Sequence, residues 1–207
     1  PNLSADHAKQ VLICDGNQDF KTPTSEHIAN EKIGIEHALT THSLQTKMVK
    51  STRLIDHLKM GSKQTVVAFG TSLTAVGAWV DQLRTVFNQQ FPGQVNLING
   101  AQGGANSDWG VKNLDEKVLK HRPDCVFIEF SINDAVGSRR TTVGRARKNL
   151  NNMIDRILVK NQSCEIILMV MNTPVGHTRT RRPNLATFEN NYREVAKERG
   201  FQLIDHG

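Results

Sequence analysis

The chain has 207 residues, the length of one ordinary domain, and its 38% hydrophobic and 22% charged residues are globular values that exclude a disordered chain. Its apolar runs are shorter than the roughly 18 residues that a membrane-spanning helix needs, so no membrane span is expected. The net charge of +6 comes largely from arginine-rich stretches without neighbouring aromatic residues, which favours a solvated basic surface over a nucleic-acid groove.

Residues 1–62 are polar and rich in histidine, with helical periodicity only in places. We interpret them as a helical extension or as the tail of an upstream region. The chain starts Pro1-Asn2-Leu3-Ser4, without the charged and then apolar segments of a signal peptide. Because the first residue is proline and not methionine, we expect a fragment or a processed form. The localisation stays open between cytoplasmic and secreted.

From residue 64 onward, short apolar runs alternate with amphipathic helical patterns, which is typical of βαβ units. Strands are predicted over residues 65–69, 95–98, 125–130 and 165–171, and from residue 201 onward. Helices are predicted between them, over residues 79–87, 111–120, 143–157 and 185–196, and the last of these ends at Gly200 in a C-terminal cap.

Apolar strands joined by crossover helices indicate a parallel sheet that is covered on both faces, with right-handed connections. For residues 63–207 we therefore predict an α/β domain with the flavodoxin-like three-layer α/β/α fold and a doubly wound parallel sheet of about five strands. In such sheets, ligands bind beyond the carboxyl ends of the strands. The segments that directly follow the first three strands are therefore the candidates for a functional site.

The first strand is followed by Gly70-Thr71-Ser72-Leu73-Thr74. A serine at a sharp turn from strand to helix exposes its hydroxyl, and the helix N-terminus favours negative charge beside it. Ser72 is therefore a candidate nucleophile. The alternative is that Ser72 caps the following helix. Thr74 stands where the Gly-x-Ser-x-Gly elbow of α/β-hydrolases has its last glycine, so this segment is not that motif.

Two further polar segments follow the next two strands. Residues 99–106 read Asn-Gly-Ala-Gln-Gly-Gly-Ala-Asn, and their glycines either bring backbone amides close to a ligand or form a tight turn. Their spacing is not that of a dinucleotide-binding loop. Ser131-Ile132-Asn133-Asp134 either offers the Asn amide as a donor to an oxyanion or forms an Asx turn. A hydroxyl and amide donors at one sheet edge are the parts that acyl transfer needs.

These three segments, in this order, resemble the sequence blocks of the SGNH hydrolases, also called the GDSL family. Residues 70–73 resemble the first block, with Thr71 where aspartate is usual. Residues 99–104 resemble the second block, and residues 123–134 resemble the third, with Ser131 where glycine is usual. The resemblance covers residues 64–207 and includes the order of strands and helices.

The resemblance implies a role for each matching residue. Ser72 would be the nucleophile. The backbone amides of Ser72 and Gly104, together with the side chain of Asn133, would form the oxyanion hole. Asp134 would support the loop that orients Asn133.

The family takes its general base from an Asp-x-x-His block after the fifth strand, and no such block follows that strand here. Asp205-His206 are adjacent on the predicted strand and would point to opposite faces, which suits a catalytic pair poorly. We expect the base and its carboxylate beyond Gly207. Thr71, next to the nucleophile, and His177, after the fourth strand, are expected to contact substrate.

The predicted function is serine-dependent hydrolysis of an oxygen ester, a short acyl or acetyl ester of a small molecule or saccharide. Arginines after the third and fourth strands favour a polar or anionic substrate over a long-chain lipid. A non-catalytic ligand-binding module, an acyltransferase on the same scaffold and a nucleic-acid-binding domain stay open as alternatives. No cofactor or metal is expected, because the three cysteines have neither metal nor disulfide spacing. The sequence does not indicate the oligomeric state.

Overall fold

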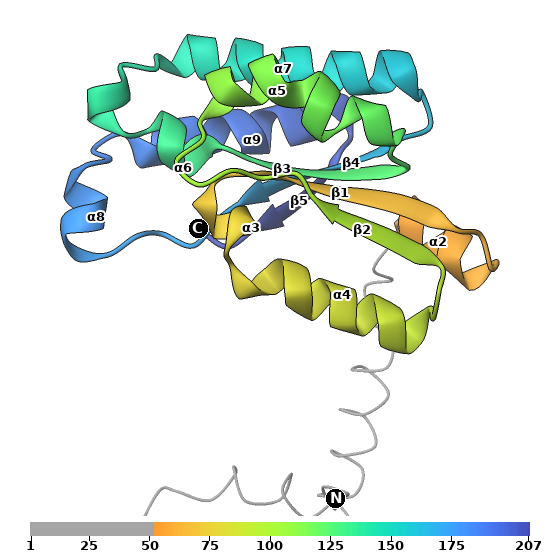
Figure 1. Cartoon of the computed structure of the whole chain (residues 1–207). Helices are drawn as coiled ribbons and strands as arrows, with labels where there is room; N and C mark the ends of the chain where they lie inside the picture. Colours follow the sequence, from red (N-terminus) through yellow and green to blue (C-terminus); the bar gives the residue numbers. More distant parts are fainter. Residues whose placement is uncertain (1–51) are drawn as a thin grey trace, which may run out of the picture. The chain divides into compact units, whose positions relative to one another are not determined.

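The structure of the protein is a computed structural model that describes residues 52–207 (Figure 1). Of the helical extension predicted over residues 1–62, residues 1–51 lie outside the described residues. The rest contains helix α2 (Arg53–Lys59), which begins after the cap residue Thr52. Leu54 and Leu58 of α2 are buried in the same apolar cluster as strand residues of the sheet. This short helix therefore packs on the core of the domain.

A parallel sheet of five strands forms the centre of the domain, in the order β2-β1-β3-β4-β5 (Figure 1). All four strand pairs are parallel. The chain passes from β1 to β2, crosses back over β1 to β3, and continues to β4 and β5, which is the doubly wound flavodoxin-like order. This confirms the predicted fold class. The strands are β1 (Gln64–Gly70), β2 (Val95–Asn99), β3 (Cys125–Glu129), β4 (Glu165–Val170) and β5 (Gln202–Asp205).

Helices cover both faces of the sheet (Figure 1). Helix α4 (Ala78–Gln90) lies with α2 on one face. The opposite face is covered by α5 (Ser107–Lys117), α7 (Val143–Lys160) and α9 (Leu185–Arg199). The remaining helical segments are short: α3 (Ser72–Ala75), α6 (Ser131–Asp134), α8 (Gly176–Thr180) and the 3-10 helices η2 (Leu119–His121) and η3 (Gly137–Arg139).

Strand β1 shows why the strands read as continuous apolar runs. Val66 and Ala68 pack in the apolar cluster under α2 and α4, whereas Val67 and Phe69 pack in the cluster under α5, α7 and α9. Successive residues of a strand point to opposite faces, and all four are completely buried. The part of a strand that is covered on both faces therefore reads as a continuous apolar run.

Local capping defines several helix ends. Asn106 caps α5 by accepting a hydrogen bond from the backbone N–H of Trp109, and Thr142 caps α7 by accepting one from Arg145. Gly200 ends α9 with a φ of 68°, in the left-handed region that favours glycine. This confirms the C-terminal cap predicted at Gly200.

No helix among residues 52–207 combines the length and the hydropathy that crossing a bilayer requires. In the same region Cys125 and Cys164 are buried free thiols, and no group of three or more His, Cys, Asp or Glu side chains is arranged to hold a metal. Cys14 lies outside the described residues.

Buried Glu165, the first residue of β4, binds the N-terminus of α2. Its carboxylate accepts hydrogen bonds from the backbone N–H groups of Arg53 (3.2 Å) and Leu54 (2.8 Å). N–H groups in the first turn of a helix have no partner within the helix, and negative charge is favourable beside them. Glu165 therefore fixes α2 against the sheet.

We expect the substitution Glu165→Ala to lower the free energy of unfolding by about 1–3 kcal/mol, because two N–H groups lose their acceptor. Urea denaturation followed by circular dichroism measures this change. The matched control is Glu116→Ala, which removes an exposed carboxylate on α5 and should change stability by less than about 0.5 kcal/mol. Equal stability of the two variants would contradict the role given to Glu165.

Candidate active site

A cavity of about 400 Å³ lies at the carboxyl end of the sheet and brings two of the predicted site residues together. Ser72 follows β1 and Asn133 follows β3, and both line this cavity. The short helices α3, α6 and α8, which follow β1, β3 and β4, gather at this end of the sheet (Figure 1). The other lining residues are Leu73, Ile132, Met171, Asn172, Thr173, Pro174, Val175, Thr178 and Arg182.

The turn after β1 presents Ser72 as the first residue of α3. Thr71 is the cap residue of this helix, because its hydroxyl accepts a hydrogen bond from the backbone N–H of Leu73 (3.2 Å). Ser72 is partly exposed, and within residues 52–207 its hydroxyl has no hydrogen-bond partner. The alternative that Ser72 caps the helix is therefore wrong, because Thr71 is the cap residue.

Buried Glu129, the last residue of β3, holds this turn in place. Its carboxylate accepts hydrogen bonds from the backbone N–H of Thr71 (2.6 Å), from the Thr71 hydroxyl (2.8 Å) and from the Thr74 hydroxyl (2.7 Å). Burial raises the pKa of Glu129 to about 7, although the hydrogen bonds from the two threonines lower it. Thr71 is completely buried, so the structure does not support its predicted contact with substrate.

The sequence alone did not single out Glu129. Glu129 stands in an apolar strand of the sequence. A carboxylate that is buried in such a strand needs hydrogen-bond donors around it. This requirement is the sequence signal that could have indicated that Glu129 holds a neighbouring segment. Arg182 belongs to the arginine-rich stretch after the fourth strand, which in the sequence favours a polar or anionic substrate. The structure places Arg182 in the wall of the cavity.

The glycine-rich loop after β2 bends over the end of β1. The backbone N–H of Gln102 donates to the carbonyl oxygen of Gly70 (3.1 Å), and the N–H of Ala105 donates to the carbonyl oxygen of Gln102 (3.1 Å). Gly104, inside this turn, is exposed and has a φ of 73°, which favours glycine. In the described part of the chain, no acceptor binds the backbone N–H of Gly104.

The side chain of Asn133 connects α6 to this loop. Its Nδ2 donates to the carbonyl oxygen of Ala105 (2.7 Å), and its Oδ1 accepts from the guanidinium of Arg182 (3.4 Å). A carbonyl oxygen only accepts and a guanidinium only donates, so both contacts impose the same orientation on the amide. The amide nitrogen carries two hydrogens, and the second is left for a ligand.

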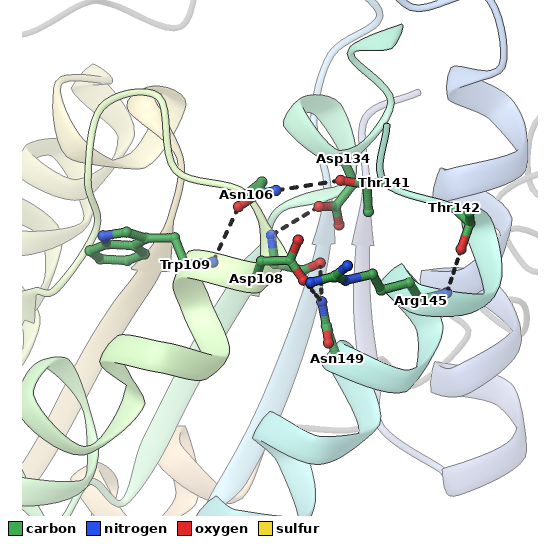
Figure 2. A network of polar contacts seen from close by, with 9 residues as sticks. Asn106, Asp108, Trp109, Asp134, Thr141, Thr142, Arg145 and Asn149 are labelled. Carbon is green, nitrogen blue, oxygen red and sulfur yellow. Dashed lines mark hydrogen bonds and ion pairs between the residues drawn. The ribbon is translucent and has the colours of Figure 1, made fainter. Parts of the chain in front are cut away.

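Asp134, next to Asn133, ties α6 to the N-terminus of α5 (Figure 2). Its carboxylate accepts a hydrogen bond from the backbone N–H of Ser107 (2.9 Å). Asn106, the cap residue of α5, also donates through its side chain to the hydroxyl of Thr141 (3.4 Å). Burial raises the pKa of Asp134 to about 6, while the hydrogen bonds from Ser107 lower it. These contacts agree with the expected supporting role of Asp134.

The same network extends to α7 (Figure 2). Asp108 of α5 accepts hydrogen bonds from the side chains of Arg145 (2.7 Å) and Asn149 (2.7 Å) of α7. Asn149 also donates to the hydroxyl of Ser107 (3.0 Å). The loop that carries Gly104 therefore runs directly into a helix whose start is held by two neighbouring segments.

Four histidines lie in the described part of the chain, and none of them lines the cavity. His177 is an exposed residue of α8. Val175 and Thr178, on either side of it, do line the cavity, and the contact of His177 with substrate stays a prediction. His206 is exposed, and its backbone N–H donates to the carbonyl oxygen of Val170 (3.0 Å).

Asp205 does not pair with the side chain of a histidine. Both of its carboxylate oxygens accept hydrogen bonds from Arg193, at 2.7 Å and 2.9 Å, and this partner lowers the pKa of Asp205. The structure therefore brings together Ser72, Asn133 and the loop of Gly104. It places no His–Asp pair at the cavity within residues 52–207.

The two buried carboxyl groups predict how stability depends on pH. In the folded protein the pKa values of Glu129 and Asp134 are about 7 and about 6, above their ordinary values of 4.5 and 3.8. The folded state therefore binds these protons more tightly than the unfolded chain. Such a contribution is complete below the unfolded pKa and is lost as the pH rises through the folded pKa. We expect the free energy of unfolding to fall from pH 4.5 to pH 7 and then to level off.

The variant Glu129→Gln tests the larger of these contributions. It should remove a pH-dependent change on the order of 3 kcal/mol, because each pKa unit corresponds to about 1.4 kcal/mol. Urea denaturation at pH 4.5, 6 and 7.5 measures the slope, and Asp81→Asn, a change of an exposed carboxylate, is the control. A slope that is the same in wild type and Glu129→Gln would contradict the prediction.

Comparison with known proteins agrees with this geometry. A family model of GDSL-like lipases and acylhydrolases matches residues 68–207, whereas no curated protein matches the chain. Among solved structures, the lipase/acylhydrolase from Enterococcus faecalis is 28% identical with a TM-score of 0.61, and the match covers 70% of this chain and 76% of that one.

Two more distant structures share the fold. LAE5, an alpha/beta hydrolase enzyme from the metagenome of Lake Arreo in Spain, is 19% identical with a TM-score of 0.61, over 70% of this chain and 77% of that one. Axe2-W215I, an acetyl xylan esterase from Geobacillus stearothermophilus, is 17% identical with a TM-score of 0.58, over 70% and 77%. Because the family model covers more than half of the chain, this protein belongs to the GDSL-like lipase/acylhydrolase family, and its general activity is the hydrolysis of esters.

Proposed function

We propose that the protein hydrolyses a short acyl or acetyl ester through an acyl-enzyme that forms on Ser72. The observation that carries this proposal is the shared cavity of Ser72 and Asn133. It offers a hydroxyl that has no hydrogen-bond partner among the described residues and an oriented amide donor, and these are the two kinds of group that acyl transfer requires.

Three donors are available for the oxyanion. The backbone N–H groups of Ser72 and Gly104 have no acceptor within residues 52–207. Asn133 adds the second hydrogen of Nδ2, because the first is held by Ala105. Donors that are fixed before the reaction stabilise the charge of the tetrahedral intermediate without reorganisation. The hydrogen bonds of Glu129 and Arg182 supply that fixation.

The reaction then follows in two steps. The Oγ of Ser72 bonds to the acyl carbon, the carbonyl electron pair moves to its oxygen, and the ester C–O bond breaks as the alcohol leaves with a proton. Water next attacks the acyl carbon, the bond to Oγ breaks, and the free acid leaves while Ser72 regains its proton. A general base must carry these protons, because an unactivated serine is a weak nucleophile.

The cavity and the solved structures both favour a small substrate. A volume of about 400 Å³ is at the low end of ligand pockets, which suits a short acyl group with part of its alcohol. Apolar side chains such as Ile132, Met171 and Val175 line it. Axe2 is named as an acetyl xylan esterase, and an acetylated saccharide is the substrate class that we propose here.

A second function, binding of an acylated ligand without turnover, is favoured by one observation. No histidine of the described region lines the cavity, so no general base for Ser72 is in place there. A binding module and an esterase differ in whether Ser72 forms a covalent bond, and one experiment separates them.

Labelling of the full chain with a fluorophosphonate, followed by mass spectrometry of its peptides, should place the phosphonate on Ser72. Hydrolysis of 4-nitrophenyl acetate should fall by about a thousandfold or more in Ser72→Ala. The control is Ser62→Ala, which changes an exposed serine and should keep full activity. An unlabelled Ser72 in a chain that still binds esters would overturn the esterase and support the binding module.

The variant Asn133→Ala tests the oxyanion donor. We expect kcat to fall by about 10²–10³-fold, which is the usual effect of losing one such donor, with little change in KM. Steady-state kinetics on the same ester measures both constants. A change confined to KM would instead show that Asn133 binds the ground state and does not stabilise the oxyanion.

The size of the cavity predicts the preferred acyl length. Acetyl and butyryl esters of 4-nitrophenol should have a higher kcat/KM than the dodecanoyl ester, because a cavity of about 400 Å³ cannot hold a twelve-carbon chain together with the rest of the ester. The three esters share one leaving group, so the comparison reports acyl binding alone. A preference for the dodecanoyl ester would rule out the proposed substrate class.

A further inference from the structure

Two arginine-bearing loops meet beside the cavity. One follows α6 and carries Arg139 and Arg140, and the other follows α8 and carries Arg181 and Arg182. The backbone N–H of Gly137 donates to the carbonyl oxygen of Arg181 (3.1 Å), which joins the loops directly. Three of these cations, Arg139, Arg181 and Arg182, therefore lie near one another beside the cavity.

These arginines differ from those on the helices away from the site. Several arginines on helices form an ion pair with an Asp or Glu side chain, namely Arg145, Arg147, Arg156, Arg193 and Arg199. Within residues 52–207, none of the four cavity-side arginines forms such a pair. Their charges therefore lack a neutralising partner in this part of the chain.

Arg182 lies in the wall of the cavity itself. Its guanidinium donates to the carbonyl oxygens of Ile132 (2.7 Å) and Thr178 (2.7 Å) and to Oδ1 of Asn133 (3.4 Å). All three acceptors are neutral, so they fix the position of the group without cancelling its charge. A guanidinium has five N–H donors, and these contacts do not use all of them.

Arg139 lies beside Gly104, whose backbone N–H is one of the proposed oxyanion donors. Its guanidinium nitrogen is 3.8 Å from the position that a Cβ would take on Gly104. Burial lowers the pKa of Arg182, and the charges of Arg181 and Arg139 lower it further, so the three cations repel each other. The Arg139 charge also lowers the pKa of Asp134, but that carboxyl is buried and bonds to Ser107. A bound anion would relieve this repulsion.

We propose that Arg182, with Arg139 and Arg181 beside it, binds a negatively charged group of the substrate and makes the site selective for esters that carry a carboxylate. This inference rests on the proposed esterase function and names its substrate class. The favoured partner is a small anion and not a nucleic acid, because no aromatic side chain of residues 52–207 lines the cavity for a base to stack on.

The test compares two esters that differ in one charge. 3-Acetoxybenzoate and 3-acetoxybenzamide have the same acetyl group and nearly the same shape, but only the first is an anion. Wild type should hydrolyse the benzoate with about a tenfold higher kcat/KM or more, which is the usual gain from a charge-assisted hydrogen bond. Raising the salt concentration should reduce this preference, because ions screen partly exposed charges.

Substitutions of single arginines beside the cavity then show which of them cause the preference for the benzoate. Arg182→Gln should lower the preference by about tenfold, mainly through the KM of the benzoate, and Arg182→Lys should retain part of it. Arg139→Gln, whose wild-type side chain makes no hydrogen bond in the described region, should lower it as well. Lys160→Gln removes one exposed charge at the end of α7 and is the control for net charge.

Two outcomes would overturn the inference. Equal hydrolysis of both esters by wild type would show that no anion is recognised. An equal loss for both esters in Arg182→Gln would show that Arg182 only positions Asn133.

Titration calorimetry of Ser72→Ala with the two esters separates this inference from the esterase proposal. Preferential binding of the benzoate without any turnover by wild type would refute the esterase alone, and equal binding would refute the anion site.

Discussion

The contact between Glu129 and the turn after β1 is the interaction on which the candidate site depends. One carboxylate from β3 accepts three hydrogen bonds from Thr71 and Thr74, which flank Ser72. The two strands come so close that a Cβ on Gly70 would lie 2.4 Å from the carboxylate oxygen. Glycine is therefore required at that position. Thr71 and Thr74 are engaged in this contact, whereas the hydroxyl of Ser72 has no hydrogen-bond partner within residues 52–207.

The polar groups behind the site form a second constraint. Asn133 binds the loop of Gly104, and Asp134 binds the N-terminus of the helix that this loop enters. Neighbouring residues of α6 thus hold both ends of a short segment. Buried polar groups are costly unless each has a partner, and the satisfied network makes the donors rigid. Rigid donors are what electrostatic catalysis requires.

Arg182 differs in its partners from several arginines on the helices. Exposed ion pairs such as Arg145 with Asp108 link helices to one another and contribute little stability each. Arg182, in contrast, is held by neutral oxygens at the wall of the cavity. Arg182 therefore brings a charge without a carboxylate partner among residues 52–207 to the wall of the cavity.

The sequence by itself determined the fold class and the order of the strands and helices, because the periodicity of apolar residues is a local property and right-handed crossovers leave few topologies. It also identified the segments of Ser72, Gly104 and Asn133, since each follows a strand end. Only the tertiary structure decided that Thr71 and not Ser72 caps α3, that Glu129 holds this turn, and that Arg182 reaches the cavity. Glu129 is 58 positions from Thr71 and Arg182 is 49 positions from Asn133. Contacts between residues so far apart depend on how the strands and loops pack, which no local pattern records.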